Sequence, residues 1–303
     1  MPETVTDRSH LERLRRQDPG LVLLDVRLAD DHAACHLPGA LNNCVFEVAF
    51  LDRMRGLAAS PQAPLCVYGH GEDSLEADEA CAKLERAGYT RVHVLTGGLD
   101  AWRAAGGETA GAGEPPPAAH PWPAGRSELD PGACRVEWLG RNLLNSHWGT
   151  VETVTGHVVG SADGLEGGEI VLDLRSLVCA DLAGTDLHDV MIAHLASDDF
   201  FFVERWPTAR YVIRAGRFLA DAAPGAPNLR ITGDLTLRGV TAPLAFTAVA
   251  GVAPDGRAGA QATVVCDRTR WGVNYGSGRL FRRLAGHLVN DEIELRLRLV
   301  LAT

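Results

Sequence analysis

Leu229–Arg238 reads LRITGDLTLR, and this stretch decides the fold of the second half of the chain. Its apolar residues alternate with polar ones, a period of two that is typical of a strand with one face on a core and the other in solvent. The stretch from Ile293 to Leu301 repeats the pattern, with arginine and glutamate between the apolar positions. Both stretches predict strands of an antiparallel sheet.

Working outward, similar short strands are predicted near residues 134–141, 150–162, 168–175, 209–219, 243–253 and 258–267. About eight strands in roughly 180 residues indicate a closed barrel or a sandwich. A barrel of this size is either filled by its own side chains or holds one small ligand, and the sequence leaves both open. One helix is predicted, at Leu187–Ser197, with Asp186 as its cap.

Three consecutive phenylalanines, Phe200, Phe201 and Phe202, follow this helix. Successive side chains point in different directions on a helix or a strand, so one element cannot turn all three rings to one core face. Aromatic residues make up only 6% of the chain, which makes the run a local concentration. It predicts aromatic surface on more than one side, either two walls of one core or a core and a cavity.

The first half of the chain has a different pattern. Continuous apolar runs at Leu21–Arg27, Leu65–Tyr68 and Val92–Leu95 are typical of buried parallel strands. Helices are predicted at Ser9–Arg16, from a capping box, and at Ser74–Ala87, from apolar residues at helical spacing. Strands that alternate with helices predict a parallel α/β sheet.

Gly106–Pro121 reads GGETAGAGEPPPAAHP, a composition that cannot form a core and that its prolines stiffen in part. It predicts a linker at 106–121 between a domain at 1–105 and a domain at 122–303. The fold class predicted from the two patterns is thus α/β followed by all-β.

The first domain resembles the rhodanese family. The resemblance rests on LLDVR at Leu23–Arg27, CHLPGALN at Cys35–Asn42, VYGHGEDS at Val67–Ser74 and TGGLDAW at Thr96–Trp102. It implies a parallel sheet with helices and a loop that cradles sulfur on a nucleophilic cysteine. The sequence departs from the family there: the cysteine position is Gly69, and the loop consists of Gly69, His70, Gly71, Glu72, Asp73 and Ser74.

This departure predicts a catalytically inactive domain. A persulfide and its anionic donors need free backbone N–H groups at a helix N-terminus, whereas Asp73 and Glu76 are spaced to cap the helix themselves. The other reading is a sulfurtransferase or sulfur carrier that uses a different thiol, with Cys44 as the candidate because it follows a strand end. The alternative for Cys44 is a packed free cysteine.

The second domain resembles the YceI-like family of lipocalin-like lipid-binding barrels. The motifs are Asp130-Pro131, HLASDDFFFVERWPTARYVI from His194, GDLTLRGVTAPLAF from Gly233, DRTRWGVNYGSG from Asp267, and Asn290-Asp291. The resemblance implies an elongated antiparallel barrel that holds an isoprenoid-tailed or quinone-like lipid. The candidate ligand-binding residues are His147, Trp148, His194, Phe200, Phe201, Phe202, Trp271 and Tyr275. Asp267-Arg268 and Arg270, near Trp271 and Tyr275, are expected to form a surface ion pair, the alternative being contacts to a quinone or pyrophosphate head group.

Composition limits the other function classes. The 303 residues carry a net charge of -10, and no basic cluster predicts binding to nucleic acid. Seven scattered cysteines without a CxxC pair, and a start without an apolar signal segment, predict a cytoplasmic protein with free thiols. The sequence shows no metal signature, no dinucleotide fingerprint and no apolar run long enough to span a membrane, so no metal and no cofactor is expected.

The sequence therefore favours a two-domain binding protein. The barrel is expected to bind a small amphiphilic ligand, and the first domain to serve docking or regulation through a protein partner. Two alternatives stay open: a sulfurtransferase that works through Cys44, and a structural interaction protein whose barrel is solid.

Overall fold

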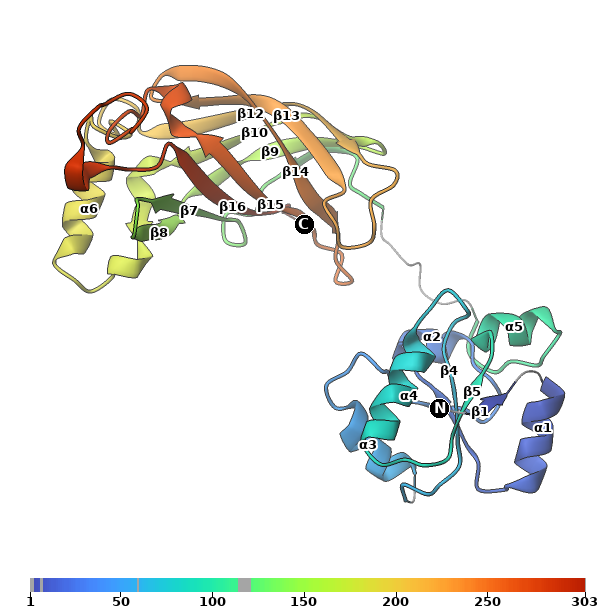
Figure 1. The fold of residues 1–303 in the computed structure, drawn as a ribbon. Helices are drawn as coiled ribbons and strands as arrows, with labels where there is room; N and C mark the ends of the chain where they lie inside the picture. Colours follow the sequence, from blue (N-terminus) through green and yellow to red (C-terminus); the bar gives the residue numbers. More distant parts are fainter. Residues whose placement is uncertain (1–2, 6–7, 59, 114–120, 303) are drawn as a thin grey trace. The chain divides into compact units, whose positions relative to one another are not determined.

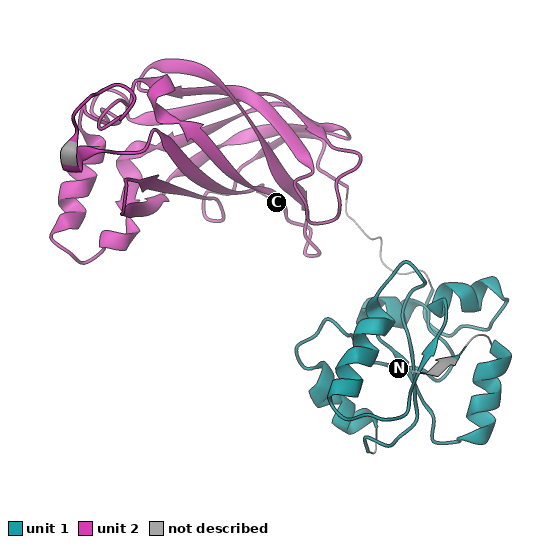
Figure 2. Cartoon of the chain, viewed as in Figure 1, with its two compact units in different colours: residues 1–118 teal, residues 119–303 magenta. Residues whose placement is uncertain are grey.

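The structure is a computed structural model that describes residues 3–5, 8–58, 60–113 and 121–302. The chain divides into two compact units, residues 1–118 and 119–303 (Figure 2). No helix within these described ranges is both long and apolar enough to cross a membrane.

The first unit is a parallel sheet with the strand order β1-β5-β4-β2-β3 (Figure 1). Two helices pack on each face: α3 and α4 bury Phe50, Met54, Ala80 and Leu84 in one core, while α1 and α5 bury Leu11, Leu14, Leu99 and Trp102 in the other. The predicted parallel α/β sheet is confirmed. The element bounds are β1 (Glu3–Val5), α1 (Arg8–Gln17), β2 (Val22–Asp25), α2 (Ala29–Ala34), β3 (Leu41–Asn42), α3 (Phe50–Leu57), β4 (Leu65–Tyr68), α4 (Glu76–Arg86), β5 (Val92–Leu95) and α5 (Gly98–Ala104).

A buried polar network explains the charged end of the LLDVR motif. Arg27 donates from Nε and Nη2 to the two carboxylate oxygens of Asp25, at 3.0 and 2.6 Å. The Tyr68 hydroxyl donates to Asp25 Oδ2 at 2.9 Å. Burial alone would raise the pKa of Asp25, but the hydrogen bonds and charge of Arg27 outweigh it and hold that pKa below its ordinary value. The network links β2 to β4 at the carboxyl ends of these two strands, next to the loop at residues 69–74.

Part of the predicted linker is hydrogen-bonded to the first unit. Ala110 and His36 form an antiparallel bridge, and the N–H of Ala112 donates to the carbonyl of Ala33 at 2.8 Å. The indole of Trp102 donates to the carbonyl of Glu108. Residues 114–120, with the three prolines, lie outside the described residues.

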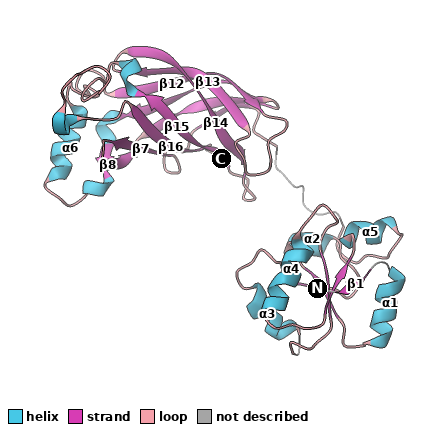
Figure 3. Cartoon of the chain, in the orientation of Figure 1, coloured by secondary structure: helices cyan, strands magenta, loops and turns pink. Residues whose placement is uncertain are grey.

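The second unit is an antiparallel barrel (Figures 1 and 3). Three long strands are each interrupted once, which gives the segments β6 (Gly125–Glu128) and β7 (Arg135–Arg141), β8 (Ser146–Val151) and β9 (Val154–Ser161), and β10 (Gly164–Asp173) and β11 (Leu177–Cys179). Five continuous strands follow: β12 (Thr208–Phe218), β13 (Leu229–Leu237), β14 (Val240–Val252), β15 (Ala258–Asp267) and β16 (Glu292–Val300). The predicted antiparallel barrel of about eight strands is confirmed.

The first long strand, which is divided into β6 and β7, closes the barrel because it is hydrogen-bonded to a neighbouring strand on each side. β6 pairs with β9, and β7 pairs with both β8 and β16. Between β6 and β7, Leu129 forms a bridge with Leu301 while its N–H donates to the carbonyl of Gly156. The ladder between β14 and β15 is short, running only from Val249↔Gln261 to Val252↔Ala258. Arg270 crosses this gap and donates to the carbonyl of Pro243.

Helix α6 (Leu187–Ala196) lies at the end of the barrel where β7 and β8 turn (Figure 1). Asp186 stands at its N-cap but makes no capping bond with its side chain, so the predicted cap is wrong. The chain leaves the helix through Phe202, whose φ of 50° is the left-handed conformation that bulky residues rarely adopt. Its N–H donates to Ser197, and its carbonyl accepts from Arg205 and Trp206. This turn sends the triple phenylalanine in more than one direction.

Candidate functional site

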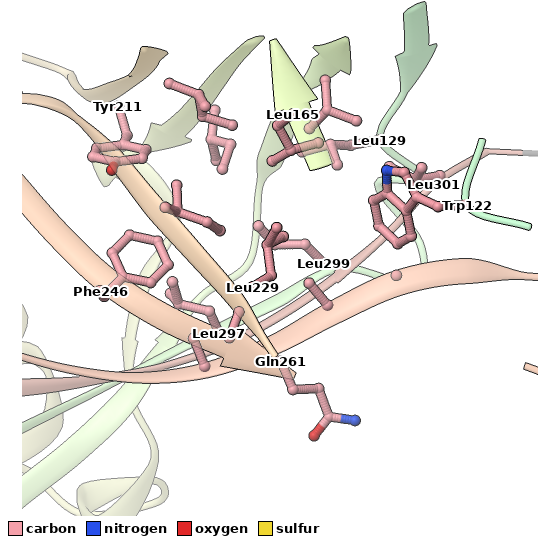
Figure 4. A pocket seen from close by; sticks show the side chains of 18 residues that line it. Trp122, Leu129, Leu165, Tyr211, Leu229, Phe246, Gln261, Leu297, Leu299 and Leu301 are labelled. Carbon is pink, nitrogen blue, oxygen red and sulfur yellow. The ribbon is translucent and has the colours of Figure 1, made fainter. Parts of the chain in front are cut away.

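The interior of the barrel contains three apolar cavities. The first, of about 40 Å³, lies at the end marked by Trp122 and Leu301 (Figure 4). The second, of about 50 Å³, lies between Ile170, Leu244 and Leu297. The third, of about 120 Å³, lies at the α6 end, against Leu195 and Trp271. Each exceeds the roughly 10–15 Å³ that one water needs, yet their linings offer few polar partners to hold water.

The three cavities follow one another along the barrel. The first and second share the lining residues Ile170, Tyr211, Phe246, Leu297 and Leu299. The second and third share Val136, Leu172, Ala209, Leu235 and Leu295. The three cavities therefore form a row, here called the apolar path, from the Trp122 end to the α6 end, and the shared side chains stand between one cavity and the next.

Small side chains on β14 and β15 explain why the interior is not filled. Alternate residues of these strands face the core, and alanine occupies six of those positions: Ala242, Ala248, Ala250, Ala258, Ala260 and Ala262. An eight-stranded barrel has an interior that larger side chains would fill. The alanines leave space beside Phe246 and Leu297, and this space is the first cavity (Figure 4).

Two indole groups on the lining of this path are donors without a hydrogen-bond partner in the described part of the chain. Trp122 lines the first cavity and Trp138 lines the third, so they mark opposite ends. The Nε1 atom of each is buried and has no hydrogen-bond partner among the described residues. By contrast, the hydroxyl of Tyr211 donates to the carbonyl of Leu244 and the indole of Trp271 donates to that of Leu235. A buried unpaired donor is costly, and a ligand oxygen can satisfy it.

The structure corrects the expectation for Arg268. This residue is 2% exposed, and its guanidinium donates to the carbonyls of Val273, Val289 and Asn290 at 2.6, 3.1 and 2.9 Å. It is therefore not a surface ion pair with Asp267, whose carboxylate accepts from Arg279 instead. Arg268 holds the loop from η3 (Arg268–Trp271) to β16 together, and it also lines the third cavity, with its Cζ 5.8 Å from the ring centroid of Phe200.

Three of the candidate ligand-binding residues line the third cavity: Phe200, Phe201 and Trp271. Two others pack behind Phe200. The ring of His194 lies edge-on to Phe200 and to Tyr275, with centroid distances of 4.9 and 4.6 Å. Tyr275 also contacts Phe200, at 5.3 Å. His194 and Tyr275 therefore pack against Phe200, whose ring lines the third cavity.

The remaining three candidates are not among the residues that line the three cavities. Phe202 forms the left-handed turn after α6. Trp148 alternates with the inward-facing Gly149 and Val151 on β8, so its ring is 41% exposed and lies on the outer wall, beside Glu294 and Arg296. His147 pairs with Asp181, with 2.8 Å between Nδ1 and Oδ2.

In the first unit, a carboxylate fills the loop formed by residues 69–74. Glu76 is 8% exposed, and its Oε2 accepts from the backbone N–H of His70 at 2.9 Å. A Cβ at Gly69 would lie 2.6 Å from that oxygen. The His70 ring lies between Glu76 and Asp31, at 2.9 and 3.6 Å. The chain's own carboxylate therefore occupies the position where a nucleophilic side chain would stand.

This arrangement corrects the predicted capping box. Helix α4 begins at Glu76, after Leu75, and it has no side-chain cap. Asp73 is exposed, and Glu76 bonds to the loop at His70 rather than to an N-cap residue. The spacing of Asp73 and Glu76 matches a capping box, but spacing alone does not show how the loop before the helix folds. The TGG motif positions this loop: the N–H groups of Leu99 and Asp100 donate to the carbonyls of Gly69 and His70.

Several of the thiols are buried. Cys44 is 2% exposed, which agrees with a packed cysteine. Burial raises the pKa of both Cys66 and Cys81 to about 12, and that of Cys266 to about 11. Since the thiolate is the nucleophile, these thiols are inert at neutral pH.

Two domain families match the chain. Residues 128–301 match the YceI-like domain, and residues 8–105 match the rhodanese-like domain. A UPF0312 protein of Pseudomonas putida (strain W619) is 31% identical over 144 residues, which are 46% of this chain and 68% of that protein. A thiosulfate sulfurtransferase GlpE of Pseudomonas putida (strain GB-1) is 37% identical over 91 residues, which are 30% of this chain and 76% of that protein.

Two solved structures are also similar to part of the chain. BcnA of Burkholderia cenocepacia has 19% identity and a TM-score of 0.46, covering 58% of this chain and 99% of that one. A polyisoprenoid binding domain from Saccharophagus degradans has 15% identity and a TM-score of 0.44, covering 60% and 99%. The match of the YceI-like domain spans more than half of the sequence. The chain therefore belongs to the YceI-like family and carries a rhodanese-like domain ahead of its barrel.

Proposed function

We propose that the barrel binds an amphiphile with a long hydrocarbon tail, of the isoprenoid or quinone type. The apolar path formed by the three end-to-end cavities carries this proposal. The tail would lie along the inward-facing leucines and alanines, and ligand oxygens would accept from the indoles of Trp122 and Trp138, whose N–H groups lack partners among the described residues.

Apolar burial supplies enough free energy for such binding without any special residue. Each buried methylene contributes about 0.8 kcal/mol. Ten buried methylenes contribute about 8 kcal/mol, which corresponds to micromolar affinity before the costs of association are subtracted. The path needs only length and an apolar lining.

A chain-length series tests the proposal. Lipid-depleted protein is titrated with isoprenoid quinones of increasing tail length, and tryptophan fluorescence is recorded because Trp122, Trp138 and Trp271 line the cavities. At about 0.8 kcal/mol per methylene, affinity should rise about fourfold per added carbon until the path is full, and then level off. Affinity that does not change with tail length would contradict a buried tail.

For the first domain we propose docking or regulation in place of sulfur transfer. The activity in the name of the GlpE relative makes sulfur transfer the second candidate. Against it stand Gly69 at the nucleophile position and the Glu76 carboxylate in the loop. The negative charge of Glu76 would also repel thiosulfate.

A thiosulfate:cyanide assay separates the two candidates. We expect no turnover by the wild-type chain, and none by Gly69→Cys, because Glu76 occupies the space next to the new thiol. The double variant with Gly69→Cys and Glu76→Ala frees both the space and the His70 N–H, and it should form a persulfide detectable by intact mass. Wild-type turnover that disappears in Cys44→Ser would instead establish sulfur transfer through Cys44.

A further inference from the structure

Three potential metal ligands converge at the α6 end of the barrel. His147 comes from β8, Cys179 from β11, and Asp181 from the short helix η2 (Ala180–Leu182). His147 Nδ1, Cys179 Sγ and a carboxylate oxygen of Asp181 all lie within 4.8 Å of one another. The residues meet because β11 pairs antiparallel with β8, which sets Cys179 opposite Gly149, two residues from His147. The chain then turns at once into η2.

The distances are close to those of a bound metal. Ligand atoms around a tetrahedral Zn²⁺ lie about 3.4–3.6 Å apart, given bonds of about 2.0–2.3 Å. Cys179 Sγ is 3.4 Å from Asp181 Oδ1, and His147 Nδ1 is 2.8 Å from Asp181 Oδ2. The sulfur–oxygen pair is at coordination distance, but the two pairs use different oxygens of Asp181, so the carboxylate must either rotate or bind the metal through both oxygens. The nitrogen–oxygen pair needs to separate by about 0.6 Å, which rotation of the half-exposed His147 ring allows.

A backbone hydrogen bond holds Asp181 in place, and burial holds Cys179. Asp181 Oδ1 accepts from the backbone N–H of Trp148 at 2.9 Å, which fixes the carboxylate over the end of β8. Cys179 is fully buried and cannot turn to solvent. His147 and Asp181 are partly exposed, so the side facing solvent is open to a metal and to a water as fourth ligand.

We propose that His147, Cys179 and Asp181 bind a divalent transition metal of the Zn²⁺ class, with water as the fourth ligand. Imidazole nitrogen, thiolate sulfur and carboxylate oxygen are the donors that Zn²⁺ takes in proteins. On binding, Zn²⁺ forms a bond to Cys179 Sγ, and the thiol proton leaves to solvent.

Such a site would join the barrel wall to the segment that leads into α6. His147 belongs to the wall strand β8, while Asp181 precedes α6 by a few residues. Helix α6 contributes Leu195 to the third cavity. Metal binding would thus stabilise the closed end of the barrel. The proposal does not depend on the nature of the ligand inside.

Cobalt spectroscopy on the full-length, untagged, chelator-treated chain tests the site. Co²⁺ should bind with a stoichiometry of one and give the charge-transfer absorption of a thiolate–Co²⁺ bond, and Zn²⁺ should displace it. Cys179→Ser should abolish this absorption. His147→Gln should weaken binding at least about 100-fold, since even residues that only orient a ligand are worth 10–100-fold.

Matched controls keep the test decisive. His188→Gln removes an imidazole that pairs with Asp189 on α6 outside the cluster, and Cys134→Ser removes a half-buried thiol elsewhere; both should bind Co²⁺ as the wild type does. Thermal unfolding checks that each variant is folded. Because the His147 side chain is partly exposed, His147→Gln should stay folded and still test the site even if Cys179→Ser is unstable. Absence of thiolate–Co²⁺ absorption in the wild type, or unchanged affinity in a folded His147→Gln variant, overturns the proposal.

Discussion

Ala262→Phe is expected to reduce lipid binding at least tenfold while leaving the barrel folded. Ala262 faces the interior on β15 and lines the first cavity beside Leu297, its partner on β16. A phenyl ring there would occupy space that the ligand tail needs. Competitive titration with the best quinone of the chain-length series measures the effect.

The same variant distinguishes a hollow barrel from a solid one. In a packed core an extra ring costs about 1–3 kcal/mol in the free energy of unfolding. Here the first cavity, of about 40 Å³, takes part of the ring, so the free energy of unfolding should fall by only about 1 kcal/mol, the low end of that range. The control Thr263→Phe places the ring on the exposed face of the same strand and should leave binding unchanged. A destabilised Ala262→Phe variant with unaltered binding would contradict the account.

Arg268→Met is expected to lower the free energy of unfolding of the barrel by about 3–5 kcal/mol, as when one partner is removed from a buried charged pair. The guanidinium is buried, and its loss leaves three backbone carbonyls without their donors. Burial favours the neutral form and lowers the pKa of Arg268, an effect that the charges of Asp291 and Asp267 oppose. Methionine keeps the apolar stem but supplies no donor.

Thermal and urea unfolding of the full chain measure this loss. For a domain of this size a loss of about 4 kcal/mol lowers Tm by roughly 8–16 °C. The control is Arg296→Met, which removes an exposed pair with Glu294 and should cost less than about 1 kcal/mol. Equal effects of the two substitutions would show that the buried carbonyl contacts contribute little.

Alternation of apolar residues predicts the strands well because a half-buried strand leaves a period of two in the sequence. The strand predicted from Leu229–Arg238 spans Leu229–Leu237, and the one predicted at 258–267 spans Ala258–Asp267. The single strand predicted at 150–162 is divided into β8 and β9. The break at Glu152 and Thr153 depends on bonds to Ser176, which is distant in sequence.

Contacts between distant residues decide the parts that local patterns could not predict. Burial of Arg268 depends on the loop that ends at Asn290, and the bond from His70 to Glu76 depends on how the loop folds back. Phe200, Phe201 and Trp271 stood out as aromatic candidates, whereas Trp122 and Trp138 did not, because each is an isolated tryptophan whose sequence neighbours carry no ligand-binding pattern. Trp122 and Trp138 line cavities inside the barrel only because the strands close around them.

The His147–Cys179–Asp181 cluster shows the same dependence. His147 and Asp181 are 34 positions apart in the chain and meet only because β8 and β11 pair. Metal signatures that can be recognised in sequence have short, regular spacings. The sequence therefore predicted no metal, and only the pairing of strands suggests a site.

Native mass spectrometry of the full-length chain as purified tests the central claim most directly. The account predicts a population heavier than the bare chain, which returns to the bare mass after solvent extraction and releases an amphiphile with a long hydrocarbon tail. The lipid-depleted chain should regain that mass when loaded with an isoprenoid quinone, and Ala262→Phe should not. A chain that carries no lipid as purified and takes up none on loading would contradict the account.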